Sequence, residues 1–301
     1  MELLRLIENI RSPFLDVVIG VITSLGEETF VVAVICAMFW CINKRATYIT
    51  GVVFFLSGLT VQGMKICFQI ERPWVIDPSF SPVPSALEHA TGYSFPSGHT
   101  QSATALFGSL GAIIKRKPIK ALCFIVVVLV AFSRLYLGVH TLPDVAASVL
   151  FTLLIIFLTV KLRADDAINK RRELIGSFLM VLYAVAAIVL AAVLYSGGRI
   201  EMAYLSDCLK AAGAGVGFAV GMYVERVYID FSVRAKNMLW QVIKFILGIA
   251  GVLAIQEGLK LVIGTGLAVD TIRYFIMIMW ILVFYPLIIK RFFSVVNNNQ
   301  K

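Results

Sequence analysis

Long apolar stretches separated by short polar connectors constrain this chain more than any other feature of its sequence. A helix needs about 20 mostly apolar residues to cross the hydrocarbon core of a bilayer. Such stretches predict nine spanning helices, at residues 28–43, 46–68, 97–114, 120–140, 142–162, 173–196, 208–225, 238–260 and 269–290. The composition, 59% hydrophobic and 15% charged, lies outside the usual range of a soluble domain. The sequence therefore predicts an all-α, polytopic membrane helical bundle.

The first 27 residues differ from the predicted spans. Apolar residues recur at helical spacing from Leu3 to Ile10, with Arg5 and Glu8 between them. The apolar run 14–25 is too short to cross a bilayer alone. We therefore expect residues 1–27 to form an interfacial amphipathic segment on the membrane surface, with no cleavable signal.

The basic residues indicate how the chain is oriented. The net charge is +9, and loops rich in Lys and Arg stay in the cytoplasm. The loops on this side carry Lys44, Arg45, the run 115–120, Lys161, Arg163, Lys170, Arg171, Arg172, Arg226, Arg234, Lys236, Lys290 and Arg291. The positive charge is therefore a topology signal and predicts no nucleic-acid partner. The connector 69–96, the junction 140–141 and the loop 197–207 are expected on the extracytoplasmic side.

Cysteines and repeated glycines have structural interpretations. Cysteine spacing fits neither a disulfide framework nor a metal site, and we interpret all five as buried small apolar residues. They are Cys36, Cys41, Cys67, Cys123 and Cys208. Gly213, Gly217 and Gly221 recur every four residues in an apolar stretch, which is typical of helix packing and not of a nucleotide-binding loop.

Three polar clusters lie next to predicted spans, where charge is costly and usually functional. They are residues 65–73, 96–99 and 133–144. In the first cluster, Lys65 and Arg72 are seven residues apart, so both can lie on one face at the end of a helix. Snorkelling cations are the alternative interpretation of either residue alone.

The second and third clusters add histidines. Pro96 ends any preceding helix, Ser97 can cap the next one and Gly98 allows close backbone approach, so free N–H groups can face an anion. His140 stands at a corner between two predicted helices. Asp144 follows His140 by four residues and can reach its ring, and can also complete a capping box opened by Thr141.

Together these residues supply the chemistry of phosphoryl transfer. Fixed cations at Lys65, Arg72 and Arg134 and a helix N-terminus can spread the charge of a phosphoryl group. A histidine beside a carboxylate can act as a nucleophile, and a second histidine, His99, can act as an acid. No carboxylate or His/Cys grouping in the sequence suits a divalent ion, so we expect neither a metal nor another cofactor.

The order and spacing of these residues resemble the signature of the type 2 phosphatidic acid phosphatase superfamily, whose active site vanadium haloperoxidases share. Every signature position is filled: Lys65-(six residues)-Arg72-Pro73, then Pro96-Ser97-Gly98-His99, then Ser133-Arg134-(five residues)-His140-(three residues)-Asp144. The resemblance covers residues 60–150 well. It implies a six-helix phosphatase core, followed here by about three to four additional C-terminal transmembrane helices.

The resemblance also implies a role for each site residue. His140 would form a phosphohistidine, Asp144 would orient it and His99 would protonate the leaving alkoxide. Five residues would hold the phosphate oxygens: Lys65, Arg72, Ser97, Gly98 and Arg134. The third histidine, His89, has no partner in the signature and is expected to be structural or incidental.

The predicted domains are therefore an interfacial segment at 1–27, a phosphatase core at 28–165 and additional transmembrane helices at 166–301. The predicted activity is hydrolysis of a membrane lipid phosphate or pyrophosphate at the extracytoplasmic face of the cell membrane. A connector carrying Trp74, Phe80, Leu87 and Tyr93 is apolar enough to meet a lipid chain.

Three alternatives remain open from the sequence. The substrate can be a soluble sugar phosphate, as in glucose-6-phosphatase, whose helix count is similar. The phosphoryl group can pass to another lipid instead of water. The chain can also be a transporter whose intramembrane charges line a pathway. The sequence specifies neither an oligomeric state nor a lipid.

Overall fold

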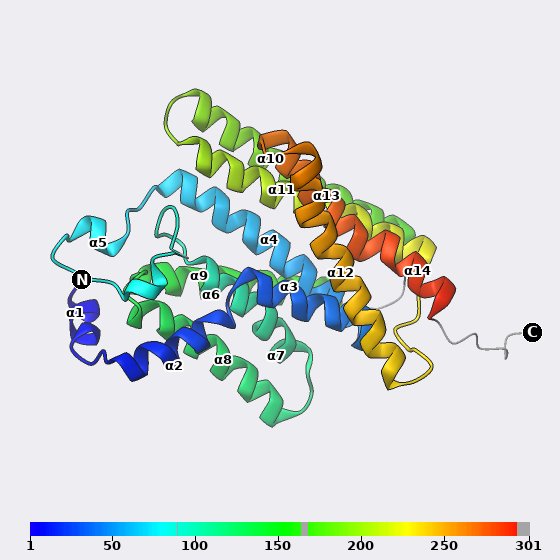
Figure 1. Ribbon diagram of the computed structural model, residues 1–301, viewed down its shortest axis with the longest axis horizontal. Coiled ribbons are helices and arrows are strands. Elements are labelled where there is room, and N and C mark those ends of the chain that lie inside the picture. The colour runs from blue at the N-terminus through cyan, green and yellow to red at the C-terminus, as the bar shows by residue number, and fades with distance from the viewer. Residues whose placement is uncertain (89, 164–167, 294–301) are drawn as a thin grey trace, which may run out of the picture. The chain divides into compact units, whose positions relative to one another are not determined.

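The computed structural model describes residues 1–88, 90–163 and 168–293. His89, the polar tail and the predicted boundary at 165–166 lie outside these residues. The described chain is helical, and Figure 1 shows the order of its elements. The α-helices are α1 Glu2–Glu8, α2 Pro13–Ser24, α3 Glu28–Ala37, α4 Lys44–Phe68, α5 Pro73–Ile76, α6 Gly98–Ala103, α7 Ser109–Ile113, α8 Lys117–Tyr136, α9 Leu142–Leu162, α10 Lys170–Ser196, α11 Met202–Val224, α12 Met238–Ile263, α13 Leu267–Met279 and α14 Tyr285–Phe292.

Short π-helical turns extend or join several of these helices. The turn Met38–Ile42 follows α3, Thr104–Gly108 joins α6 to α7, Glu225–Ile229 follows α11 and Trp280–Phe284 joins α13 to α14. A single 3₁₀ turn, Pro84–Ala86, lies in the connector between α5 and α6. Most of this connector is irregular, which is expected because residues 73–96 include five prolines.

Six helical segments of the described chain are long and apolar enough to cross a membrane, which confirms six of the predicted spans. They are Lys44–Ile76, Lys117–Tyr136, Leu142–Leu162, Lys170–Ser196, Met238–Ile263 and Leu267–Phe292. The predicted span 28–43 qualifies only together with α2, as a pair of helices bent by 46°. The interfacial placement of residues 1–27 stays a prediction, because the structure contains no membrane.

The other two predicted spans form helices that are not among these six. The first consists of α6, a π turn and α7, with 6, 5 and 5 residues, which is short for a bilayer crossing. The second is α11, in which the charged residues Asp207 and Lys210 and four glycines lower the mean hydropathy. The predicted count of nine spans therefore exceeds the number that length and composition support.

The chain forms two compact units, and each is described by itself. The N-terminal unit comprises Met1–Val32 and Val52–Ala164, and the C-terminal unit comprises Ala33–Gly51 and Asp165–Lys301. The boundaries between the units fall within α3 and α4. The predicted division at residue 28 and at 165–166 stays a prediction.

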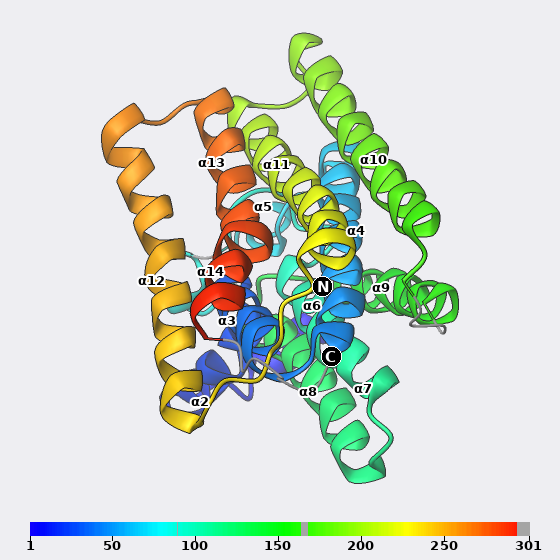
Figure 2. The ribbon, with the colours of Figure 1, turned by 90° about the vertical axis from the view of Figure 1, so that its right-hand side faces the viewer.

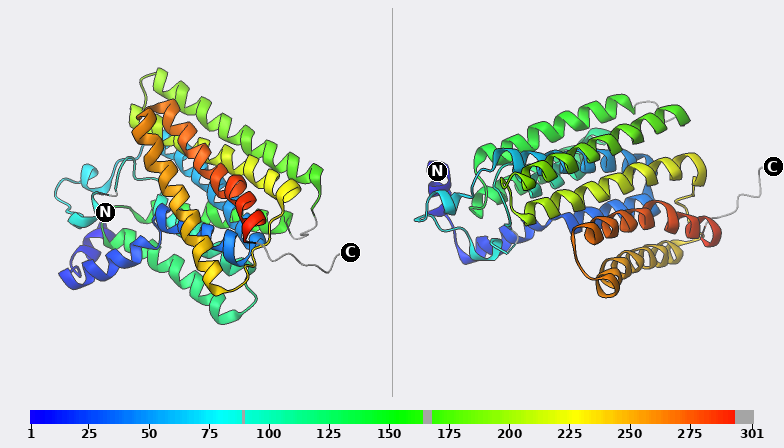
Figure 3. Two further views of the ribbon diagram at one scale, coloured as in Figure 1. Left: turned by 45° about the vertical axis from the view of Figure 1, so that its right-hand side comes forward. Right: turned by 90° about the horizontal axis from the view of Figure 1, so that it is seen from above.

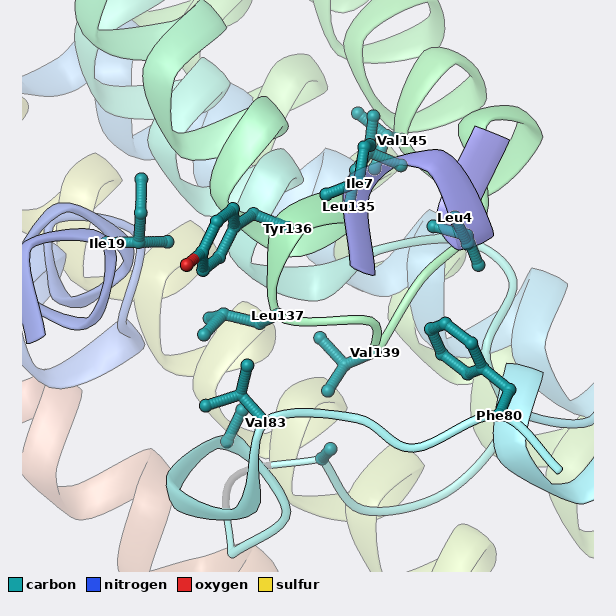
Figure 4. Packing of buried hydrophobic residues seen from close by; sticks show 12 residues of the cluster. Leu4, Ile7, Ile19, Phe80, Val83, Leu135, Tyr136, Leu137, Val139 and Val145 are labelled. Carbon is teal, nitrogen blue, oxygen red and sulfur yellow. The ribbon is translucent and has the colours of Figure 1, made fainter. Parts of the chain in front are cut away.

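In the N-terminal unit, α8 packs against α2, α6 and α7. A buried apolar cluster joins α1, the connector and the loop after α8, with Leu4, Phe80, Leu137 and Val139 among its members (Figure 4). Burial of such side chains stabilises the fold by about 1.5–3 kcal/mol each. This cluster fixes the loop that leads from α8 to α9.

In the C-terminal unit, α11 packs between α10 and α13, as Figures 2 and 3 show. The predicted glycine repeat lies at this contact. A Cβ atom added at Gly213 would lie 2.4 Å from the backbone oxygen of Thr271, and one at Gly217 would lie 2.9 Å from that of Phe275. The prediction that these glycines serve helix packing is therefore confirmed.

The cysteines agree with their predicted role only in part. All five are free, and Cys36, Cys123 and Cys208 are buried. Cys41 is partly buried, and Cys67 is exposed near the end of α4, where it was predicted to be buried. Burial at a helix end depends on which segments cover it, and residue type does not determine this.

Substitution of Gly213 by alanine should destabilise the protein, because the added methyl group meets backbone, which cannot rotate away. We expect a loss of about 1–3 kcal/mol in the free energy of unfolding, measured as a lower midpoint of thermal unfolding in detergent. Gly176→Ala on α10 is the matched control, since a Cβ there has nothing within 4 Å. Equal midpoints for the two variants would contradict the packing role of Gly213.

Candidate active site

Arg72 does not lie on the same helix as Lys65, contrary to the sequence prediction. Helix α4 ends at Phe68, Gln69 follows in the left-handed region at φ 49°, and Arg72 is extended, with φ −70° and ψ 153°. The reason is Pro73, whose ring disfavours helical backbone at the residue before it. Lys65 lies in the last turn of α4 and is partly buried.

The guanidinium of Arg72 is buried and is held by the backbone around it. Only 5% of the residue is exposed. Its Nε donates to the carbonyl of Gly92 at 2.9 Å, Nη2 to that of Thr91 at 2.7 Å and Nη1 to that of Val139 at 2.8 Å. These contacts fix the direction of the side chain and tie the connector to the loop before α9.

His140 lies directly against Arg72. Nη1 of Arg72 is 3.0 Å from Nε2 of His140, and the histidine is 2% exposed. A guanidinium can only donate hydrogen bonds, so Nε2 must be the unprotonated nitrogen and Nδ1 must carry the proton of the neutral ring. Nδ1 faces Asp144, whose Oδ2 is 3.6 Å away.

Asp144 performs both of the tasks that the sequence suggested. It is the third residue of α9, and its Oδ2 accepts the backbone N–H of Thr141 at 2.7 Å, which completes the capping box. The same oxygen is the one nearest to His140. The carboxylate therefore caps the start of α9 and lies beside the histidine ring.

Ser94 is a member of the site that the sequence analysis missed. Its hydroxyl donates to Oδ2 of Asp144 at 2.6 Å and lies 3.5 Å from Nδ1 of His140, and the residue is fully buried. The available signal was the position of Ser94 two residues before Pro96, next to a predicted anion site. A serine in a connector is common, and only the tertiary fold brings this one to Asp144.

The start of α6 lies beside the start of α9, as the clusters predicted. Ser97 is the N-cap of α6, and its hydroxyl accepts the N–H of Thr100 at 3.4 Å. The N–H of Ser97 donates to the carbonyl of Asp144 at 3.2 Å, and Ser148 bridges the carbonyls of both residues at 2.9 Å each. Gly98 and His99 form the first turn of α6.

Arg134 approaches the site from the last turn of α8. It is 1% exposed, and its Nη1 donates to the hydroxyl of Thr23 on α2 at 2.7 Å. Its Nε is buried and has no hydrogen-bond partner in the described part of the chain. A buried donor of this kind costs free energy unless it finds an acceptor, which makes this group available to a bound anion.

The connector exposes fewer apolar side chains on its surface than the sequence predicted. Phe80 is only 2% exposed, because its ring lies beneath the guanidinium groups of Arg5 and Arg11, at 5.4 and 5.2 Å. The prediction that Phe80 meets a lipid chain is therefore wrong. Val75, Ile76 and Leu87 are exposed, at 52%, 55% and 42%.

Burial lowers the pKa of His140 below its ordinary value of 6.5, because a charged ring is poorly solvated inside the protein. The carboxylate of Asp144 opposes this shift, and the positive charges of Arg72 and Arg134 add to it. The ring is therefore neutral near pH 7, as a nitrogen nucleophile must be. The arginines that repel a proton from the ring are also the groups that attract an anion.

Comparisons with known proteins show which families this chain resembles. Residues 46–168 match the family described as PAP2 superfamily, and residues 209–297 match that described as PAP2 superfamily phosphatase, transmembrane extension. Phosphatidylglycerophosphatase B of Bacillus subtilis is 28% identical over 179 residues, which cover 54% of this chain and 82% of that protein. Undecaprenyl-diphosphatase of Sulfolobus acidocaldarius is 29% identical over 181 residues, covering 58% and 84%.

A solved structure is also similar. The crystal structure of a PAP2 type phosphatidylglycerolphosphate phosphatase from Bacillus subtilis has a TM-score of 0.47 at 26% identity, over 53% of this chain and 82% of that one. The helical membrane fold and the matched families define a multi-pass membrane phosphatase. The chain belongs to the PAP2 superfamily, and residues 209–297 in its second half match the transmembrane extension of that superfamily.

The protonation of His140 can be measured directly by NMR, because a chain with three histidines gives few imidazole signals. In protein labelled at the imidazole nitrogens, the NMR signal of His140 should remain that of a neutral ring as the pH falls through 6.5. Protonation should occur only at a lower pH, since burial disfavours the charged form. A His140→Asn variant assigns the signal, and a midpoint at or above 6.5 would contradict the proposed electrostatics.

Proposed function

We propose that this protein hydrolyses the phosphate or pyrophosphate of a membrane lipid through a phosphohistidine on His140, without a metal ion, at the extracytoplasmic face. The observation that carries the proposal is the contact of 3.0 Å between Arg72 Nη1 and His140 Nε2, with Asp144 on the other side of the ring. It supports a nucleophilic lone pair at Nε2, held beside a donor that can bind a phosphate oxygen.

The proposed reaction has two displacements. Nε2 of His140 attacks phosphorus, the bond from phosphorus to the lipid oxygen breaks, and His99 gives its proton to that oxygen. As the ring gains positive charge, the carboxylate of Asp144 stabilises it. Water then attacks the phosphohistidine, His99 takes the proton of the water, and the phosphorus–nitrogen bond breaks to release phosphate and restore His140.

Positive groups with fixed positions support the metal-independent form of the reaction. Arg72 would turn a donor from Nε2 to a phosphate oxygen as phosphorus approaches, and the buried Nε of Arg134 would meet another. The N–H of Gly98, the hydroxyl of Ser97 and the ammonium of Lys65 would hold the rest. Such preorganised donors stabilise the transferring phosphoryl group more than water does.

The apolar surroundings favour a lipid over a soluble substrate. Phe68, at the end of α4, is 58% exposed, and Val75 and Ile76, just after Arg72, are also exposed. The related proteins named above are a phosphatidylglycerophosphatase and an undecaprenyl-diphosphatase. The extracytoplasmic placement of the site rests on the positive loops at the opposite ends of the spanning helices.

The substrate class can be tested with a panel of phosphatidate, phosphatidylglycerophosphate, sphingosine phosphate and undecaprenyl pyrophosphate in detergent. We expect phosphate release from at least one of them. His140→Ala should lower kcat by at least about a thousandfold, because it removes the nucleophile. His89→Ala is the matched control and should retain full activity.

The panel also separates the alternatives. Turnover of none of these lipids would overturn the proposal, and so would full activity in His140→Ala. Glucose 6-phosphate at low concentration should leave lipid turnover unchanged, and strong competition would favour a soluble sugar phosphate. A labelled lipid alcohol added as acceptor distinguishes hydrolysis from phosphotransfer.

Metal independence has its own test. EDTA should leave the activity unchanged, because the proposed phosphate ligands are guanidinium, ammonium, hydroxyl and backbone N–H groups. Vanadate should inhibit, since it adopts the five-coordinate geometry of the transferring phosphoryl group. An absolute requirement for Mg²⁺ would contradict this part of the proposal.

A further inference from the structure

The N-terminal segment, residues 1–27, precedes the part of the chain that matches the PAP2 superfamily, which begins at residue 46. The structure nevertheless packs it onto the site. Helices α1 and α2 both contact α8, the helix that carries Arg134, within the N-terminal unit. This raises the question of what the segment contributes to catalysis.

Thr23, in the last turn of α2, is the first point of contact. Its hydroxyl accepts a hydrogen bond of 2.7 Å from Nη1 of Arg134, and the two residues are 9% and 1% exposed. A buried guanidinium needs acceptors to offset its desolvation. Because Thr23 accepts a hydrogen bond from Nη1, it restricts the orientation of the guanidinium plane. It thereby also sets the direction of the N–H at Nε, which has no partner in the described part of the chain.

Gly26, just after α2, is the second point of contact. A Cβ atom at this position would lie 2.7 Å from the backbone oxygen of His99 and 2.8 Å from Val130 on α8. The backbone at Gly26 therefore packs directly against the first turn of α6. The end of α2 thus touches the helix of Arg134 and the histidine proposed as the general acid.

Tyr136 is the third point of contact and begins the loop that leads to His140. Nε of Arg11 donates to its carbonyl at 2.8 Å, the N–H of Ser12 donates to its hydroxyl at 3.2 Å, and that hydroxyl donates to Asp16 at 2.9 Å. Tyr136 is 1% exposed, and Figure 4 shows it between Ile19 of α2 and the loop residue Leu137.

We infer that α2 contributes to the active site through Thr23. Thr23 is a positioning residue: its hydroxyl orients the guanidinium of Arg134 toward the phosphate. The inference rests on the proposed role of Arg134 as a phosphate ligand. It predicts that the hydroxyl of Thr23 controls affinity for a phosphoryl group without itself touching the substrate. Helix α2 would thus supply a function that the matched family region, residues 46–168, does not contain.

The test compares Thr23→Val, which keeps the shape and removes the hydroxyl, with Thr23→Ser, which keeps the hydroxyl. Loss of a hydrogen bond to a charged group should raise the inhibition constant of vanadate about tenfold and lower kcat/KM by about the same factor. Thr23→Ser should restore both values. Ser24→Ala is the matched control, because Ser24 is partly exposed and its hydroxyl donates to the carbonyl of Val21 on its own helix.

A merely structural role would give a different result. Loss of folded enzyme lowers the apparent kcat but leaves KM and the inhibition constant of vanadate unchanged. A double-mutant cycle sharpens the distinction: in an Arg134→Met background, Thr23→Val should produce no further change in vanadate affinity. If Thr23→Val is not recovered folded, Thr23→Cys carries the same test, since a thiol is a weak acceptor of similar size.

The inference is overturned if folded Thr23→Val binds vanadate as the unmodified protein does, or if its effect persists without the arginine. Either result leaves the proposed function intact as long as His140→Ala remains inactive. Full activity of His140→Ala, in contrast, rejects the proposed function. In that case direct vanadate binding, which needs no turnover, still decides whether Thr23 acts through Arg134.

Discussion

One carboxylate oxygen, Oδ2 of Asp144, connects the elements of the candidate active site. It accepts the hydroxyl of Ser94 from the connector and the N–H of Thr141 at the start of α9, and it is the atom nearest to Nδ1 of His140. A buried carboxylate is stable only when such partners surround it. The position of the connector, the first turn of α9 and the orientation of the histidine ring therefore depend on one another.

The buried guanidinium of Arg72 extends this constraint to the connector. Three backbone carbonyls accept its hydrogen bonds, two from residues 91–92 and one from Val139. Irregular backbone is costly to bury unless its polar groups are paired, so the arginine stabilises the loops as much as they orient it. In the proposed reaction, Nη1 would turn to phosphate while Nε and Nη2 keep their bonds to the connector.

The sequence predicted much of this arrangement because its signals are local. Apolar length predicts a span, proline before a serine predicts a helix start, and the spacing of Thr141 and Asp144 predicts a capping box. The parts that it missed depend on tertiary packing. Phe80 is covered by two arginines from residues 1–11, and Ser94 and Thr23 meet their partners across 50 and 111 residues of sequence. The helical register expected between Lys65 and Arg72 failed because a single proline outweighed the spacing.

The transmembrane extension forms a compact unit with residues that lie far before it in the sequence. Residues 33–51 precede the three polar clusters in sequence, yet they belong to the C-terminal unit. There the indole of Trp40 donates to the carbonyl of Ile281 at 3.0 Å, and Lys44 pairs with the fully buried Glu225 at 2.8 Å. A chain cut at the end of the matched PAP2 region, residue 168, would leave Trp40 and Lys44 without these partners. Lys44 is the first residue of α4, so the transmembrane extension pairs with the start of this helix within the C-terminal unit.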